Sequence, residues 1–249
     1  MSSLDSSVSG WLAALERRHL AELTFSEVTR ALRALSSCYV ERRTRLSTGG
    51  ALDSRGKRAA FALFYGPVHF CLARQIVRAL NAASAQTQHV VDLGCGTGAA
   101  GAAWAIESLA RVSGSDRNAW AVSEANWTYR ELGLRGRALR GDAARFTARA
   151  HAGTGIMLAY LVNELADGQR DGLLTSLLTA SRRGAHVLAI EPISRRIAPW
   201  WGEWERAFTS AGGRADEWRF PSDLPQRQRD LARAAGLDPR ELTARTLWL

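Results

Sequence analysis

The run HVVDLGCGTGA, which starts at position 89, constrains the fold of this chain more than any other segment. Its first part, His89–Leu93, is apolar enough for a buried strand and runs directly into a turn. That turn contains Gly94, Gly96 and Gly98, which permit tight bending and the close approach of a ligand. The alanine-rich segment Ala99–Leu109 is predicted to form a helix whose N-terminus faces this ligand. The pattern therefore predicts a nucleotide-type binding turn.

Two classes of cofactor fit such a turn, and an acidic residue distinguishes them. Gly96, Gly98 and Gly101 match the G-x-G-x-x-G spacing of dinucleotide-binding proteins. Asp116 follows about twenty residues later, as that fingerprint also expects. Asp92, however, stands at the end of the strand, where its carboxylate would repel a pyrophosphate. Because S-adenosylmethionine carries an ammonium, a sulfonium and no phosphate, the acid favours this cofactor.

Two more acidic residues follow predicted strands and extend the cofactor site. The strand Ala110–Ser115 ends at Asp116, whose carboxylate can accept hydrogen bonds from both ribose hydroxyls. Asp142 closes a third short strand and can accept from the adenine amino group, although an acid there is also typical of a helix cap. The residues predicted to bind the cofactor are Asp92, Gly94, Cys95, Gly96, Gly98, Asp116, Arg117, Asp142 and Ala143.

Three short motifs carry a resemblance to a known family. They are DLGCGTG at 92–98, GSD at 114–116 and GDA at 141–143. On these motifs the region from about 85 to 195 resembles the class I S-adenosylmethionine-dependent methyltransferases. The resemblance implies an α/β fold, with a doubly wound, mostly parallel, Rossmann-like sheet of seven strands that ends in an antiparallel pair.

The chain is predicted to divide into a helical N-terminal extension, residues 1–84, and a cofactor-binding methyltransferase domain, residues 85–249. Thr24 and Glu27 form a capping box, and the apolar spacing that follows predicts a helix over Phe25–Arg45. A second helical run begins near Ala59. It resumes after Pro67, which is tolerated in the first turn of a helix, and reaches about Leu80.

Beyond the glycine turn, strands and helices alternate, as parallel pairing with right-handed crossovers requires. Further strands are predicted over 155–161, 185–190, 215–220 and 243–249, and helices over 170–181, 199–212 and 224–235.

Composition limits the class of protein further. The chain has 249 residues and 46% hydrophobic content, enough to bury a full α/β core. It contains no uncharged apolar stretch of about eighteen residues, and its N-terminus lacks an export signal, so no membrane partner is predicted. Cys38, Cys71 and Cys95 are isolated in sequence, which favours neither a disulfide framework nor a metal site. We therefore expect a protein of the reducing cytoplasm.

Basic residues give a formal net charge of +9, and all but Lys57 are arginine. One group brackets a glycine-bearing loop and consists of Arg42, Arg43, Arg45, Arg55, Lys57 and Arg58. Another surrounds the third strand and consists of Arg135, Arg137, Arg140, Arg145 and Arg149. Basic patches beside a cofactor site favour a phosphate-rich partner such as RNA, although a plain solvated surface has the same composition.

Two N-terminal runs carry a finer resemblance. ALRALSSCYVERR at 31–43 and AAFALFYGPVHF at 59–70 resemble the leader of the mitochondrial-type ribosomal small-subunit methyltransferase family. That resemblance implies a substrate in small-subunit ribosomal RNA. This chain lacks the cysteine cluster that some members use for a metal cluster, so no iron-sulfur role is carried over.

Candidate catalytic residues follow the fourth strand, in the run AYLVNEL. Tyr160, Asn163 and Glu164 are expected to face the methyl group, with Asn163 orienting a base and Glu164 accepting a proton. Glu164 could instead be a cap or a surface acid. The tryptophans at 200, 201 and 204 could stack on unpaired bases or pack in the core, and the spacing favours packing. His69 and His186 are expected to be structural.

The sequence thus predicts an S-adenosylmethionine-dependent methyltransferase acting on RNA, with ribosomal RNA of the small subunit as the favoured substrate. Two alternatives stay open. One is a methyltransferase that acts on a small molecule or a protein. The other is a non-catalytic ribosome-assembly factor that retains the fold and binds RNA through its basic surface.

Overall fold

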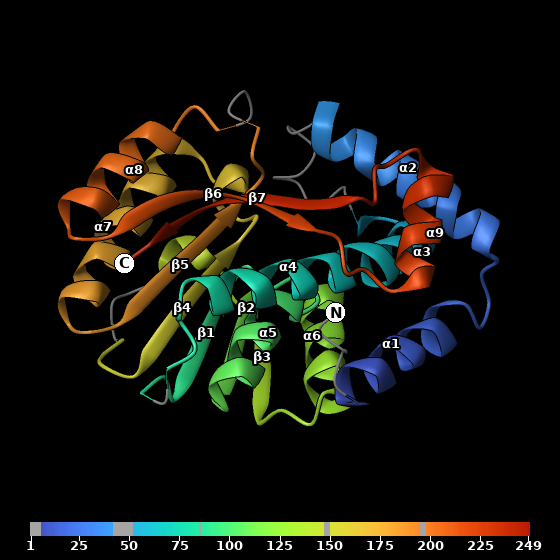
Figure 1. Ribbon diagram of the computed structural model, residues 1–249, viewed down its shortest axis with the longest axis horizontal. Helices are drawn as coiled ribbons and strands as arrows, with labels where there is room; N and C mark the ends of the chain where they lie inside the picture. The colour runs from blue at the N-terminus through green and yellow to red at the C-terminus, as the bar shows by residue number, and fades with distance from the viewer. Residues whose placement is uncertain (1–5, 42–51, 85, 147–149, 195–197) are drawn as a thin grey trace.

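A single seven-stranded sheet organises the protein, whose computed structural model describes residues 6–41, 52–84, 86–146, 150–194 and 198–249 (Figure 1). The strand order is β3-β2-β1-β4-β5-β7-β6. The strands are β1 (His89–Leu93), β2 (Arg111–Asp116), β3 (Gly136–Arg140), β4 (Thr154–Ala159), β5 (His186–Glu191), β6 (Arg214–Pro221) and β7 (Glu241–Trp248). Every predicted strand is present, with its ends within two residues of those predicted.

The first five strands are parallel, and the last two are not. β1 lies at the centre and pairs in parallel with β2 and β4, with Leu93 opposite Ser115 and Leu158. β7 runs antiparallel to both β5 and β6. The doubly wound, mostly parallel sheet and its antiparallel final pair are therefore confirmed. The order reverses at β1, which opens a crevice beyond the carboxyl ends of β1 and β4.

Helices cover both faces of the sheet, because alternate residues of its buried strands point to opposite sides. Met157 of β4 and Leu188 of β5 belong to the core under α4 (Gly66–Ala79) and α5 (Ala99–Ser108). Their neighbours Ile156 and Val187 belong to the core under the helices of the other face, which are α7 (Asp167–Arg182) and α8 (Trp201–Ser210).

The N-terminal helices gather with a C-terminal helix at one end of the molecule (Figure 1). They are α1 (Ser6–His19), α2 (Phe25–Glu41), α3 (Arg55–Ala60) and the π-helix η3 (Phe61–Tyr65), with α9 (Gln226–Ala235) beside α2. The predicted capping box is confirmed, because the Thr24 amide donates to Glu27 Oε2 at 2.8 Å and the Glu27 amide donates to Thr24 Oγ1 at 3.3 Å. Of the two predicted basic groups, Arg42, Arg43, Arg45 and Arg149 lie outside the described residues.

The second helical run is longer than predicted and does not break at Pro67. It continues from Arg55 to Ala79 through the π-turn, with Pro67 in the first turn of α4. By length and composition alone this helix could cross a membrane. In the fold, however, 72% of its apolar window is buried, as in a core helix.

Two helices lie where no range was predicted, α1 and α6 (Ala119–Glu131). A buried acid joins them: Glu124 of α6 accepts from Arg18 Nε at 3.2 Å and lies 2.7 Å from His19 Nε2. Ile76 of α4 and Val90 of β1 share one buried cluster, so the core is continuous across position 84. The division of the chain at 84 stays a prediction.

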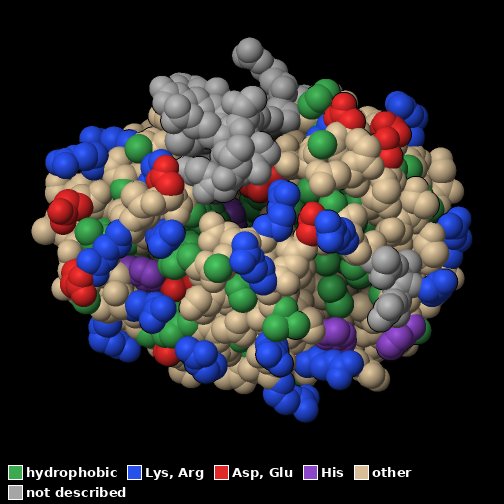
Figure 2. Space-filling view, turned by 180° about the vertical axis from the view of Figure 1, so that it is seen from behind, with side chains coloured by type: hydrophobic (Ala, Val, Ile, Leu, Met, Phe, Trp, Pro, Cys, Tyr) green, Lys and Arg blue, Asp and Glu red, His purple; other side chains and the backbone are tan. Residues whose placement is uncertain are grey.

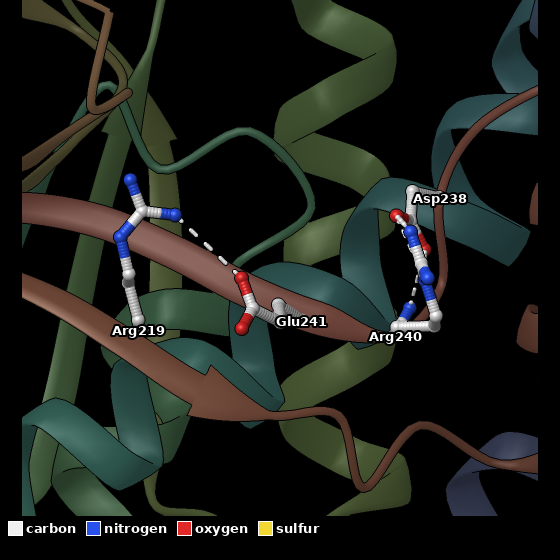
Figure 3. A network of polar contacts seen from close by, with 4 residues as sticks. All are labelled: Arg219, Asp238, Arg240 and Glu241. Atoms are coloured by element: carbon white, nitrogen blue, oxygen red, sulfur yellow. Dashed lines mark hydrogen bonds and ion pairs between the residues drawn. The ribbon is translucent and has the colours of Figure 1, made fainter.

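Exposed ion pairs lie along the hairpin of β6 and β7. Arg219 Nη1 lies 3.6 Å from Glu241 Oε2 across the two strands, and Arg240 pairs with Asp238 in the preceding loop (Figure 3). Such exposed pairs are worth at most about 1 kcal/mol each. They do, however, neutralise the arginines of this edge of the sheet.

The contact between β4 and α5 leaves no room for a side chain at Gly155. A Cβ there would lie 2.7 Å from the ring of the fully buried Trp104. We expect Gly155→Ala to lower the free energy of unfolding by about 1–3 kcal/mol, measured by urea denaturation, because overpacking displaces the ring. Gly172→Ala is the matched control. It lies on the exposed side of α7 with open space around it, and should raise stability by about 0.5–1 kcal/mol.

Candidate active site

A cavity of about 670 Å³ lies at the carboxyl ends of β1, β2, β3 and β4. Its size is that of a ligand pocket. All the predicted cofactor residues except Gly98 line it, and so do the three candidate catalytic residues. Helical residues from before the sheet also line it, namely Leu52, Phe61, Tyr65, Val68 and His69.

The glycine turn is tight because its surroundings exclude side chains. All three glycines have positive φ, between 52° and 76°. A Cβ on Gly94 would lie 2.6 Å from Leu161 Cδ1, and one on Gly98 would lie 2.7 Å from Tyr129 Cε1. At Gly96 the nearest atom would be 3.6 Å away, on Phe61, so this part of the turn is open toward the cavity.

Asp92 presents an unpaired carboxylate oxygen to the cofactor site. Its side chain is buried, and Oδ2 accepts from the Gly101 amide at 3.1 Å. Its Oδ1 is buried and has no hydrogen-bond partner among the described residues. Burial raises the pKa of this carboxyl to about 7. A cationic ligand would supply the missing partner, so the residues present fit S-adenosylmethionine.

Asp116 ties the end of β2 to the glycine turn. Its Oδ2 accepts from the Gly96 amide at 3.0 Å, and its Oδ1 accepts from the Asn118 amide at 2.8 Å. Each oxygen keeps a second acceptor site. The carboxylate lines the cavity, as a ribose-binding acid would.

The other predicted cofactor residues line the cavity and also make structural contacts within the protein. Asp142 caps the short helix η4 (Ala143–Arg145) by accepting from the Ala144 amide at 3.0 Å, so the capping alternative is observed, and it also lines the cavity. Cys95 is a buried free thiol, and burial raises its pKa. The Arg117 carbonyl accepts from Arg140 Nε at 3.2 Å.

Tyr160 adopts an unusual backbone conformation at the wall of the cavity. Its φ is +59°, a left-handed value that is costly for a residue with a side chain and is found at functional sites. Its ring stacks on His69, with centroids 4.2 Å apart and an interplanar angle of 21°. Burial lowers the pKa of His69 to about 3, so the imidazole is neutral. His69, expected to be structural, thus lines the cavity.

Asn163 is held at both ends of its amide. Its Nδ2 donates to Glu191 Oε2 at 2.6 Å, and its Oδ1 accepts from Trp200 Nε1 at 2.9 Å. Glu191 Oε1 in turn accepts from the Val162 amide at 2.9 Å. Trp200 is therefore a buried hydrogen-bond donor, and the neighbouring Trp204 packs in the core.

Glu191 is a site residue that the sequence analysis did not identify. It is fully buried, and burial raises the pKa of its carboxyl to about 8. The sequence did contain a signal for Glu191, because it is an acid at the end of the fifth strand, which lies beside the fourth. Phe61 and Tyr65 were also missed, because nothing in a helical run shows which face will meet the sheet.

Glu164 is the acid with the most freedom at this end of the cavity. In the part of the chain that the structure describes, no hydrogen bond or ion pair reaches its carboxylate, which lines the cavity. Burial raises the pKa of this carboxyl to about 7, and the nearby charge of Asp116 acts in the same direction. The alternative of a surface acid is therefore not supported. Its catalytic role stays a prediction, as do those of Tyr160 and Asn163.

No three or more histidine, cysteine or acidic side chains of the described residues are grouped to hold a metal ion.

Comparison with known proteins supports the interpretation of this site. The model of the methyltransferase small domain family matches residues 73–154, from α4 to the start of β4. A protein from Nostoc punctiforme PCC 73102, provisionally named an O-methyltransferase, has a similar fold, with a TM-score of 0.54 and 17% identity over 94% of this chain and 72% of that chain. No curated protein matches the sequence significantly.

A second solved structure comes from work on the conversion of a disulfide bond into a thioacetal group during echinomycin biosynthesis. Its TM-score is 0.51, with 17% identity over 71% of this chain and 79% of that chain. At such identities both structures support the fold alone.

The unpaired oxygen of Asp92 leads to a pH prediction for cofactor binding. The cation binds the ionised carboxylate, so affinity should rise about ten-fold between pH 6 and pH 8, across the pKa near 7. Calorimetry with S-adenosylmethionine should show this rise in the wild type and in Glu164→Gln. Asp92→Asn should bind more weakly with a flat pH profile. An unchanged profile in Asp92→Asn would remove Asp92 from the site.

Asp116 should matter through its hydrogen bonds. Asp116→Ala loses the contact with the Gly96 amide and an acceptor for the ribose, so cofactor affinity should fall about ten-fold or more. Asp238→Ala, which removes an exposed acid beside Arg240, should leave affinity unchanged in the same calorimetric titration. Equal affinities for the two variants would contradict the assignment.

The cavity, its cation-accepting acid and the matched family lead to one conclusion. The seven-stranded sheet is that of the class I methyltransferases, and the methyltransferase small domain match covers its cofactor-binding half. The chain therefore has the fold of the class I methyltransferases, and the residues of its cavity fit S-adenosylmethionine.

Proposed function

We propose that this protein methylates RNA and that its substrate is ribosomal RNA of the small subunit. The observation that supports this proposal best is a row of arginines that leads from the β3 edge of the sheet to the cavity. We call it the β3 arginine patch, and it consists of Arg117, Arg135, Arg137, Arg140 and Arg145.

Strand β3 and the loop before it contribute no acid to the β3 arginine patch. All five side chains belong to exposed residues, and no acidic residue stands between 132 and 141. Within the described ranges, no ion pair involves any of them, and Arg117 and Arg140 also line the cavity. Basic side chains are widespread on the face that Figure 2 shows. Unpaired arginines are free to neutralise phosphates.

On the opposite edge of the sheet, the arginines are paired with acids. On β6, Arg214 pairs with Asp216 at 2.5 Å, and Arg219 lies 3.6 Å from Glu241 (Figure 3). The predicted basic group near the N-terminal loop is also partly neutralised, because Lys57 pairs with Asp53 at 2.9 Å and Arg55 pairs with Glu22. Within the described residues, the arginines of β6 are thus paired with acids, whereas those of the β3 arginine patch are in no ion pair.

The residues around the cavity have separate roles in the proposed reaction. The bound cofactor supplies a methyl group on a positively charged sulfur. Asp92 and Asp116 hold the cofactor from the ends of β1 and β2. Glu164 accepts the proton that the acceptor atom loses, and Phe61 and Tyr65 exclude water from that end of the cavity.

A small-molecule substrate is the second candidate. Residues of the helices before the sheet line one side of the cavity, and a partly covered cavity suits a small substrate. A non-catalytic assembly factor would bind RNA and cofactor without turnover. We also propose the cytoplasm as the compartment, in keeping with the buried free thiols Cys71 and Cys95.

One labelling experiment separates these functions. The purified protein is incubated with tritiated S-adenosylmethionine and, in parallel, with small ribosomal subunits, naked ribosomal RNA, total protein and a metabolite extract. Label in RNA or subunits is the expected result. Label confined to protein or metabolites would overturn the proposal, and cofactor binding with no label in any fraction would indicate the assembly factor.

The β3 arginine patch should carry the salt dependence of RNA binding. Removing two arginines in Arg135→Ala/Arg137→Ala should weaken binding to small-subunit RNA about five-fold and reduce the salt slope by about 1 to 2. The double variant Arg214→Ala/Arg219→Ala removes the same charge from the other edge and should bind like the wild type. Fluorescence anisotropy at several salt concentrations measures both, and equal losses would contradict a specific patch.

A further inference from the structure

The π-turn of η3 has a cause in the sequence, because Pro67 follows it in the first turn of α4. Proline has no N–H, and in an α-helix its ring collides with the carbonyl four residues earlier, which here belongs to Leu63. The helix accommodates the proline with a wider turn, in which the Gly66 amide donates to the Phe61 carbonyl, five residues back. The Leu63 carbonyl therefore lacks its α-helical donor, the amide of residue 67.

A side chain from a distant part of the sequence supplies a donor to this carbonyl. Gln228 of α9 donates from Nε2 to the Leu63 carbonyl oxygen at 3.0 Å. The orientation of the amide follows from its partner, since a carbonyl oxygen only accepts hydrogen bonds. Gln228 is 1% exposed, and its Oε1 is buried with no partner among the described residues. Packing alone would favour an apolar side chain here, so the bond to Leu63 explains the amide.

The π-turn lies against the glycine turn of the cofactor site. A Cβ on Gly96 would lie 3.6 Å from Phe61 Cε1, and one on Gly66 would lie 3.4 Å from Thr97 Oγ1. Phe61 and Tyr65 line the cavity from the π-turn, with ring centroids 5.6 Å apart. The wall of the cavity beside Gly96 is thus built from residues that the π-turn presents.

The extra residue of the π-turn decides which side chains face the glycine turn. One residue of α-helix corresponds to a rotation of about 100°, so the segment before a π-turn is rotated by that angle relative to an unbroken helix. Without the π-turn, Phe61 would rotate away from Gly96, and the cavity would lose part of its apolar wall. Leu63 is the middle residue of the π-turn, so a bond to its carbonyl opposes that rotation.

We propose that Gln228 is a positioning residue for cofactor binding. Its amide holds the Leu63 carbonyl in the π-turn, and the π-turn keeps Phe61 beside the glycine turn of the cofactor site. The helix α9 thus takes part in this site, although none of the described residues that line the cavity belongs to it. The inference rests on S-adenosylmethionine as the ligand of the cavity and is independent of the RNA substrate proposed above.

Calorimetric titration with S-adenosylmethionine tests this role. Gln228→Met keeps the length of the side chain but removes the donor, so the Kd should rise about five-fold or more as Phe61 leaves the wall. Gln226→Met makes the same exchange at an exposed position of α9 and should bind like the wild type. Gly155→Ala, which is expected to lose stability at the end of β4 away from the cavity, should also bind like the wild type.

A second variant separates positioning from plain stabilisation. Pro67→Ala restores an amide at residue 67, which can donate to the Leu63 carbonyl in an unbroken α-helix. In the double variant Pro67→Ala/Gln228→Met, the urea midpoint should therefore return toward that of the wild type, while the Kd for the cofactor stays raised. A merely structural role of Gln228 would restore both together.

Two results would overturn the proposal. One is a Gln228→Met variant that binds the cofactor like the wild type. The other is a double variant that recovers wild-type affinity along with its stability. A wild type that does not bind S-adenosylmethionine would overturn the cofactor assignment together with this inference, whereas the identity of the methylated substrate bears on neither.

Discussion

The site depends on a carboxylate that the fold buries without completing its hydrogen bonds. Asp92 ends the central strand, and the helix that begins beyond the turn presses Gly101 against it so closely that a Cβ there would lie 2.5 Å from Oδ2. One oxygen is satisfied by that backbone amide, and the other is buried with no partner among the described residues. Leaving a buried acceptor unsatisfied costs about 1–3 kcal/mol, which a cationic ligand recovers on binding.

Charge is separated by position in the fold. The acids of the cavity stand where parallel strands end, so the sheet itself brings Asp92, Asp116 and Glu191 to one edge. The arginines of the β3 arginine patch lie on the edge strand β3 or beside it, and two of them, Arg117 and Arg140, also line the cavity. Within the described residues, exposed arginines thus gather at the β3 edge, while the acids of the cavity gather at the carboxyl ends of the strands.

The sequence predicted the sheet and the cofactor end of the site well, because both depend on local signals. The strand before the glycine turn, the acids at strand ends and the antiparallel closing pair are readable from short segments, and each is present. The end of the cavity beside β4 and β5 was only partly predictable. Glu191 meets Asn163 because β4 and β5 are neighbours, and His69 meets Tyr160 because α4 crosses the sheet. Such contacts join residues far apart in sequence, so no local pattern shows them.

The helices that precede the sheet line the cavity as well as covering the sheet. Tyr160 holds a left-handed backbone conformation that costs of order 1–3 kcal/mol, and it persists only where surrounding contacts impose it. Its amide donates to the Ile190 carbonyl at 2.8 Å, while its ring packs on His69 of α4. The strand and the helix thus share one strained residue. Because His69 belongs to α4, the conformation of Tyr160 and of the backbone leading to Asn163 depends on how α4 packs against the sheet.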